Sequence, residues 1–236
     1  MKMKYAGLIL FSCTLFINVY SLKYFVELTN VMQDKVLNYS ELSHLNGFEF
    51  CYLTLWTFIF QMFFMIVAIL DEASKLLNLS LDKQKMLSKT RAVMYNTILF
   101  PSSLIVTTLF WTLYYIERDL IFPRILDSFF PWWLNHMLHT FIILPVVIEL
   151  MLPKKYNFVS FSKAAPVLVT ILVFYTILYF SIYFRHGIWL YPIYKVMSWP
   201  QRALFTIFQM CLALTYQKIG ISLQDAKMTI ARRKVC

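Results

Sequence analysis

Charged residues are scarce in this 236-residue sequence: Asp, Glu, Lys and Arg make up 14% of it, against about 25% in soluble globular domains. Glycine is also rare, with four residues, and none of them frames the G-x-S-x-G turn of a serine hydrolase. The four histidines are too few for the histidine boxes of a membrane di-iron hydroxylase. The cysteines are scattered and make neither a disulfide framework nor a Cys-x-x-Cys metal site (Cys13, Cys51, Cys211, Cys236).

Apolar residues fill the sequence instead, at 60%, with 18% aromatic. A membrane-spanning helix needs roughly 17–25 mostly apolar residues. Six runs meet this length, at about 5–22, 50–70, 93–116, 129–152, 165–184 and 203–223. We therefore predict an all-α polytopic membrane protein, a single domain of six transmembrane helices over 1–236. The first run could instead be a cleaved signal peptide, but it is long for one, so we expect it to be retained.

The distribution of Lys and Arg predicts how the chain is oriented, because basic residues favour cytosolic loops. Of the 22 basic residues, most fall on the side that carries both termini. The opposite side has Lys23, Lys35, Arg118, Arg124, Arg185, Lys195 and Arg202. We predict cytosolic N- and C-termini, in the endoplasmic reticulum or plasma membrane. The formal net charge of +10 is then a topology signal, and nucleic-acid binding is not expected.

Two glycosylation sequons make this orientation testable. They are Asn38-Tyr39-Ser40 and Asn78-Leu79-Ser80. Glycans are added only on the lumenal or extracellular side. The predicted topology leaves only Asn38 on that side.

Polar residues within the apolar runs are the candidates for function, because a polar side chain in hydrocarbon is costly and faces the bundle interior. The fourth run has the densest set, Asn135, His136, His139 and Thr140. The second run has Thr54, Thr57 and Gln61 on one helical stripe. Pro145 follows the fourth-run set and is expected to kink that helix.

These polar residues have three possible interpretations. They could be hydrogen-bonding contacts between helices, which are common in membrane proteins. They could form a metal site at His136 and His139, although no intramembrane carboxylate or thiol completes one. They could support nucleophilic catalysis, with a threonine hydroxyl activated by a histidine base. Thr54 and His139 suit that role because both runs enter from the same face, with Cys51 and Thr57 as rival nucleophiles.

Four segments of the sequence resemble the androgen-induced-gene-one and androgen-dependent tissue-factor-pathway-inhibitor-regulating protein family. They are FWTLYYIERDLIFPRILD from Phe110, PWWLNHMLHTFIILP from Pro131, GIWLYP from Gly187 and, more loosely, YLTLWTFIFQMFF from Tyr52. Members of that family are multi-pass threonine hydrolases that cleave fatty acid esters of hydroxy fatty acids. The resemblance implies a membrane-lipid hydrolase without metal or cofactor, whose partner is a branched lipid ester.

Carried over by residue, the resemblance implies Thr54 as nucleophile and His139 as base. Asn135 is then a candidate to orient the imidazole, whereas His136 is expected to be structural. Arg118 and Arg124 could bind the substrate's carboxylate, or they could pair with Glu117, Asp119 or Asp127. Glu149 is expected to reach the membrane interface. A non-catalytic membrane regulator is the alternative function, and a solute transporter is disfavoured because no charge lies mid-span.

Overall fold

A computed structural model describes residues 5–36, 47–152 and 159–233 of the chain. These residues form helices and turns, with no strand among them. The main helices are α1 (Ala6–Val36), α2 (Leu53–Leu76), α3 (Leu81–Met94), α4 (Phe100–Glu117), α5 (Trp132–His139), α6 (Leu144–Met151), α7 (Phe161–His186), α8 (Ile193–Val196) and α9 (Trp199–Arg233). The prediction of an all-α fold is confirmed.

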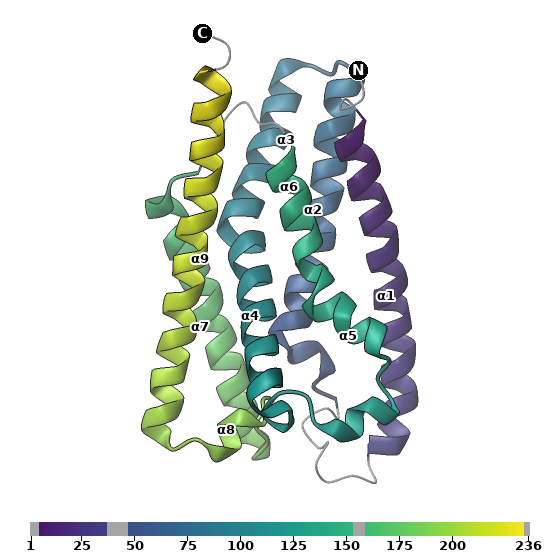
Figure 1. The fold of residues 1–236 in the computed structure, drawn as a ribbon, viewed down its shortest axis with the longest axis vertical. Coiled ribbons are helices and arrows are strands. Elements are labelled where there is room, and N and C mark those ends of the chain that lie inside the picture. Colours follow the sequence, from purple (N-terminus) through teal and green to yellow (C-terminus); the bar gives the residue numbers. More distant parts are fainter. Residues whose placement is uncertain (1–4, 37–46, 153–158, 234–236) are drawn as a thin grey trace.

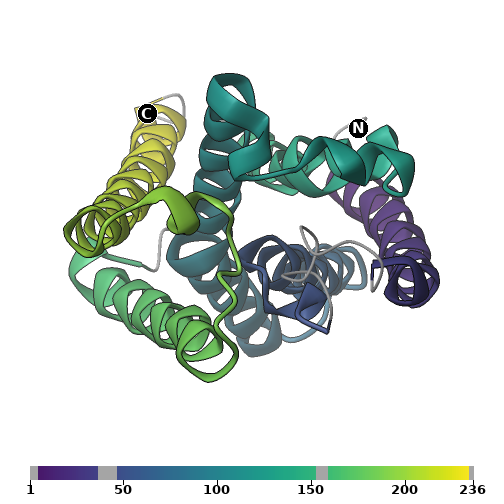
Figure 2. The same cartoon turned by 90° about the horizontal axis from the view of Figure 1, so that it is seen from below.

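The long helices run side by side along one axis, with both ends of the chain at the same end of the bundle (Figure 1). We call this the terminal end and the other the opposite end. Six helical stretches are long and apolar enough to cross a membrane: Ala6–Val31, Leu53–Leu76, Leu81–Leu120, Trp132–Met151, Phe161–His186 and Trp199–Lys227. The predicted six-span architecture is confirmed, and the chain is a multi-pass membrane protein. Figure 2, seen from the opposite end, shows α4 between the α7–α9 pair and the group of α1, α2 and α5.

Several helices extend beyond the predicted spans. The third begins at Leu81 rather than near residue 93, because the charged sequence of α3 forms a helix that hydropathy alone does not detect. The last continues to Arg233 rather than ending near 223, and the first continues to Val36 rather than 22. Hydropathy therefore located the spans but underestimated the lengths of the helices.

The third span contains a π-helical turn, Tyr95–Leu99, directly before Pro101 at the start of α4. Proline has no N–H, so the carbonyl of Thr97 lacks its donor within the helix. The side-chain nitrogen of Gln217 on α9 donates to that carbonyl at 3.1 Å. Gly220 lies one turn further along α9, where a Cβ atom would be 2.6 Å from the ring of Phe100. Glycine therefore permits the close packing of α9 against this distorted segment.

The fourth span is broken into two short helices. α5 ends at His139, a 3-10 turn covers Phe141–Ile143, and α6 starts at Leu144 with Pro145 in its first turn. The predicted kink at Pro145 is confirmed. Because the break follows His139 directly, this side chain lies at the end of α5 rather than within a continuous helix.

A buried charged cluster joins three helices toward the terminal end. The guanidinium of Arg91 on α3 contacts Asp71 of α2 at 2.8 Å and Glu149 of α6 at 2.6 Å, and it also bonds Glu72. Glu149 is 0% exposed. The expectation that Glu149 reaches the interface is therefore wrong, because Arg91 supplies its counter-charge inside the bundle. Removing one member of such a buried pair typically costs about 3–5 kcal/mol, so the cluster holds α2, α3 and α6 in register.

Candidate active site

Thr54 lies in the first turn of α2, where the chain enters the bundle from the opposite end. Tyr52, two residues before Thr54, has an extended backbone (φ −75°, ψ 137°) and is the N-cap residue of the helix. Its carbonyl accepts hydrogen bonds from the N–H groups of Leu55 and Trp56. The Thr54 N–H has no acceptor among the described residues. The N–H of Thr54 therefore remains available at the helix start.

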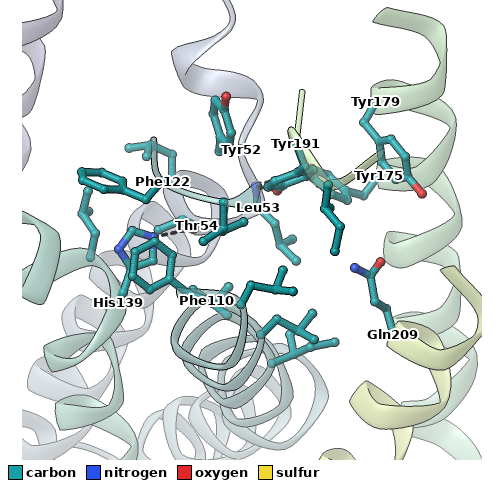
Figure 3. A pocket seen from close by; sticks show the side chains of 18 of the residues that line it. Tyr52, Leu53, Thr54, Phe110, Phe122, His139, Tyr175, Tyr179, Tyr191 and Gln209 are labelled. Carbon is teal, nitrogen blue, oxygen red and sulfur yellow. Dashed lines mark hydrogen bonds between the residues drawn. The ribbon is translucent and has the colours of Figure 1, made fainter. Parts of the chain in front are cut away.

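His139 lies across from Thr54, at the end of α5. Its side chain is buried, and its ring stacks on Phe110 of α4 with centroids 3.5 Å apart and planes 9° from parallel. The Nε2 atom of His139 is 3.4 Å from the Oγ1 atom of Thr54 (Figure 3). The structure thus brings together the two residues that sequence resemblance paired, although 85 positions separate them.

The hydrogen bonds of Nδ1 decide which nitrogen of His139 is the base. Nδ1 lies 3.1 Å from the carbonyl oxygen of Asn135 and 2.7 Å from its side-chain Oδ1. Both atoms are acceptors, so the neutral imidazole has its proton on Nδ1. Nε2 then presents its lone pair to the Thr54 hydroxyl. Asn135, predicted to orient the imidazole, makes this contact from one turn earlier in α5.

His136 points to a different set of partners. Its Nδ1 is 3.0 Å from the hydroxyl of Thr140, which also accepts the indole N–H of Trp111 at 3.1 Å. Its ring packs between Trp111 and Trp132. Among the described residues, no group of three His, Cys, Asp or Glu side chains could share a metal ion. These contacts fit the structural role expected for His136.

The two rival nucleophiles have less suitable surroundings. Burial, reinforced by the charge of Glu49, raises the pKa of the Cys51 thiol above its ordinary value, which disfavours the reactive thiolate. Thr57 is buried one turn beyond Thr54, and its hydroxyl has no hydrogen-bond partner within the described chain. Neither side chain lines the cavity described next, whereas Thr54 and His139 both do.

A large cavity opens beside Thr54 and His139 and crosses the bundle toward α7 and α9 (Figure 3). It has about 1510 Å³ of empty space, part of which is open to the surroundings. Around the Thr54–His139 pair its walls are apolar, with Phe25, Phe110 and Phe122 among them. A cavity lined mostly by apolar and aromatic side chains suits an apolar ligand.

Two tyrosines that the sequence analysis missed lie at the start of α2. The Leu53 N–H points at the hydroxyl oxygens of Tyr175 and Tyr191, 2.9 and 3.2 Å away, and these two oxygens are 2.5 Å apart. Burial raises the pKa of Tyr191 to about 12, so its hydroxyl keeps its proton. One of the two hydroxyl protons joins the oxygens, and the other has no acceptor among the described residues. The pair therefore presents one spare O–H donor beside the N–H of Leu53, the residue before Thr54.

Arg118 and Arg124 lie outside the cavity lining. Arg118 bonds the carboxylate of Asp127 at 2.6 Å and packs over the rings of Tyr114 and Phe122. The backbone N–H of Arg124 donates to Asp119, whose carboxylate also lies 3.8 Å from the Arg124 side chain. Asp127 and Asp119 are among the acidic residues with which the arginines were expected to pair if they do not bind substrate. The structure does not bring either arginine to Thr54.

Comparison with known proteins agrees with the resemblance seen in the sequence. A sequence model of the FAR-17a/AIG1-like protein family matches residues 8–225, nearly the whole chain. The chain belongs to this family. It is 31% identical to the androgen-dependent TFPI-regulating protein of Mesocricetus auratus over 177 residues, covering 75% of this chain and 74% of that protein.

Two human proteins are also similar to this FAR-17a/AIG1-like chain. The human androgen-dependent TFPI-regulating protein is 33% identical over 153 residues, or 65% of this chain and 66% of that one. The human androgen-induced gene 1 protein is 27% identical over 198 residues, or 80% and 83% of the two chains. No solved structure matches the chain. The family match runs from α1 to α9 and so includes both Thr54 and His139.

Proposed function

We propose that this FAR-17a/AIG1-like protein is an intramembrane hydrolase that cleaves fatty acid esters of hydroxy fatty acids through an acyl-threonine intermediate. The observation that carries the proposal is the hydrogen-bonded series Asn135–His139–Thr54, which opens into a mostly apolar cavity. The series has the order of orienting group, base and nucleophile that acyl transfer requires. The distance of 3.4 Å between base and nucleophile is in the looser range seen for enzymes without substrate.

In the first step, His139 Nε2 accepts the Thr54 proton while Oγ1 attacks the ester carbonyl carbon. The imidazole becomes a cation, and Asn135 stabilises it by accepting the Nδ1–H bond. The tetrahedral intermediate then expels the alkoxide of the hydroxy fatty acid, which takes the proton from His139 Nε2. The products of this step are a free hydroxy fatty acid and an acyl ester on Thr54.

In the second step, water attacks the acyl-threonine as His139 accepts one of its protons. The intermediate breaks its bond to Thr54 Oγ1, which takes the proton from His139 Nε2, and the fatty acid leaves, restoring the resting enzyme. As proposed, both steps use only side chains, the backbone and water. Arginine is not required at the reacting atoms.

Negative charge develops on the carbonyl oxygen in both steps and needs hydrogen-bond donors. Two donors at the start of α2 are unpaired among the described residues: the Thr54 N–H and, beside the Leu53 N–H, the spare hydroxyl proton of the Tyr175–Tyr191 pair. We assign them to the oxyanion. Both are preorganised by the start of α2, so they need little rearrangement during the reaction.

Covalent labelling with a fluorophosphonate, followed by mapping of the modified residue, tests the proposal directly. We expect the label on Thr54 and none on the Thr54→Ala protein. The Cys51→Ala protein is the matched control and should label like wild type. A non-catalytic membrane regulator is the second candidate, favoured by the regulatory names of the relatives. Absence of labelling, together with absence of ester hydrolysis, would support that candidate instead.

A further inference from the structure

On the side of α7, α8 and α9, across from Thr54 and His139, the cavity has polar lining residues that the proposed reaction does not use. They include Tyr179 of α7, Tyr194 of α8, and Thr206 and Gln209 of α9. Leu109, Leu113 and Leu172 also line the cavity. We call the four polar residues, Tyr179, Tyr194, Thr206 and Gln209, the distal polar site. Polar groups within a membrane span are costly unless they have partners, so their gathering at one cavity wall requires an explanation.

Among the described residues, the hydrogen bonds of the distal polar site leave one donor group free, the side-chain amide nitrogen of Gln209. Thr206 donates its proton to the carbonyl of Arg202, so its oxygen acts as an acceptor for the hydroxyl of Tyr179, 2.9 Å away, or of Tyr194, 3.4 Å away. The Tyr194 hydroxyl lies 3.1 Å from that of Tyr179 and donates to the side-chain oxygen of Gln209 at 3.5 Å. The amide nitrogen of Gln209 has no acceptor within the described chain. Figure 3 shows this nitrogen on the side of Gln209 that faces Leu53 and Thr54.

The charge of the cavity lining restricts what the site can bind. Among the described lining residues, Glu49 is the one with a formal charge, and it is acidic. Arg202 is near in sequence but does not line the cavity. Its Nε donates to the Tyr194 carbonyl, and its guanidinium lies over the rings of Trp189 and Trp199. An ionised carboxylate at this site would thus be buried without a counter-charge, which is strongly unfavourable.

We propose that the distal polar site binds an uncharged oxygen acceptor on the lipid substrate, by donation from the Gln209 amide. The acceptor is a carbonyl or hydroxyl oxygen on the same lipid whose ester lies at Thr54. A lipid acid is accepted in its protonated form, and a neutral ester is accepted at least as well. This inference rests on the proposed hydrolase function. It replaces the predicted binding of a carboxylate by Arg118 or Arg124 with the recognition of an uncharged group.

Three matched lipids separate these possibilities. The first is a fatty acid ester of a long-chain hydroxy acid with its carboxyl group free. The second is the methyl ester of that carboxyl group, and the third has a methyl group in its place. Wild-type protein should give a kcat/KM about tenfold higher for the methyl ester than for the third lipid, the usual size of one or two net hydrogen bonds. The ratio of free acid to methyl ester should rise as the pH falls, because only the protonated acid is neutral.

The variant that tests the site is Gln209→Met, which keeps the length of the side chain and removes its donors. We expect it to hydrolyse the methyl ester no faster than the third lipid, whose own rate stays at the wild-type value. Met210→Leu is the matched control, since it changes an adjacent cavity residue without removing a donor. The proposal is overturned if Gln209→Met lowers all three rates equally, or if wild-type protein does not distinguish the methyl ester from the third lipid.

Binding to the Thr54→Ala protein separates this inference from the proposed function. Affinities for the three lipids can be measured from tryptophan fluorescence, because Trp56 packs on Tyr175 of the cavity wall. The Thr54→Ala protein should bind the methyl ester about tenfold more tightly than the third lipid, and the double variant with Thr54→Ala and Gln209→Met should lose this difference. That result supports the site even if no lipid is hydrolysed. Equal affinities for the two lipids refute the site even if wild-type protein hydrolyses both.

Discussion

The side-chain oxygen of Asn135 lies 2.7 Å from Nδ1 of His139, on the side of the ring opposite to the atom that faces Thr54. This contact selects the tautomer in which Nε2 can act as a base. In the alternative tautomer, an N–H on Nε2 of His139 would point at the Thr54 oxygen. The Thr54 hydroxyl proton would then lose His139 as its acceptor. The role of Asn135 in the site is therefore to position the base rather than to touch the ester.

Replacing Asn135 with leucine should lower kcat for ester hydrolysis by about tenfold, the usual net worth of one hydrogen bond. The loss is partial because the Asn135 carbonyl still accepts from Nδ1 at 3.1 Å. Asn135→Asp should retain most of the activity, since its carboxylate can accept the same bond. Steady-state kinetics on the purified variants check this. Equal activity of Asn135→Leu and wild type would remove Asn135 from the mechanism.

Thr54→Ala and His139→Ala should each reduce hydrolysis by about a thousandfold or more, with folding preserved. The double variant should be no worse than either single one, because nucleophile and base act as a unit. Thr54→Ser keeps a hydroxyl and should retain measurable activity. Hydrolysis rates together with thermal denaturation of each variant provide the test. Loss of activity in Cys51→Ala but not in Thr54→Ala would assign the nucleophile to Cys51 instead.

The tyrosine pair predicts an unusual pattern of loss. Either Tyr175→Phe or Tyr191→Phe alone leaves one hydroxyl, which can still accept from the Leu53 N–H and donate its own proton. The double variant loses the spare donor, so kcat should fall by about 100- to 1,000-fold, the range for one oxyanion donor. Tyr52→Phe is the control, because that hydroxyl already donates to the Leu190 carbonyl. A double variant as active as the singles would exclude the pair from oxyanion binding.

The charged cluster at the terminal end should determine stability rather than chemistry. Glu149→Gln leaves Arg91 with less compensation inside the bundle and should lower the free energy of unfolding by about 3–5 kcal/mol. Lys75→Met removes a half-exposed partner of Asp71 and should cost far less. Thermal unfolding of the two variants in the same detergent compares them. Similar unfolding temperatures for Glu149→Gln and wild type would contradict the structural role of this pair.

Glycosylation mapping tests the proposed orientation. Asn78 lies in the turn between α2 and α3, at the terminal end that is proposed to face the cytosol. Asn38 lies outside the described residues, in the connection between α1 and α2. We expect a glycan only on Asn38, and expression of Asn38→Gln and Asn78→Gln proteins in a glycosylating cell shows which variant changes mobility. A glycan on Asn78 would invert the topology.

The sequence by itself determined the six spans, because a bilayer requires about 20 apolar residues whatever their contacts are. It also predicted the break at Pro145, since a missing N–H disrupts a helix locally. Family resemblance pointed to Thr54 and His139, which the structure then placed within 3.4 Å of each other. These features depend on local composition, on covalent structure or on motifs.

Tertiary structure decided the contacts that depend on how the helices rotate and tilt against one another. Tyr175 meets Leu53 from 122 positions away, and Arg91 meets Glu149 from 58 positions away. Hydropathy treats Gln209 as one polar residue in an apolar run, and only the packing of α7, α8 and α9 turns its amide toward the cavity. Each of these contacts joins different helices, so no periodicity within one helix could reveal it.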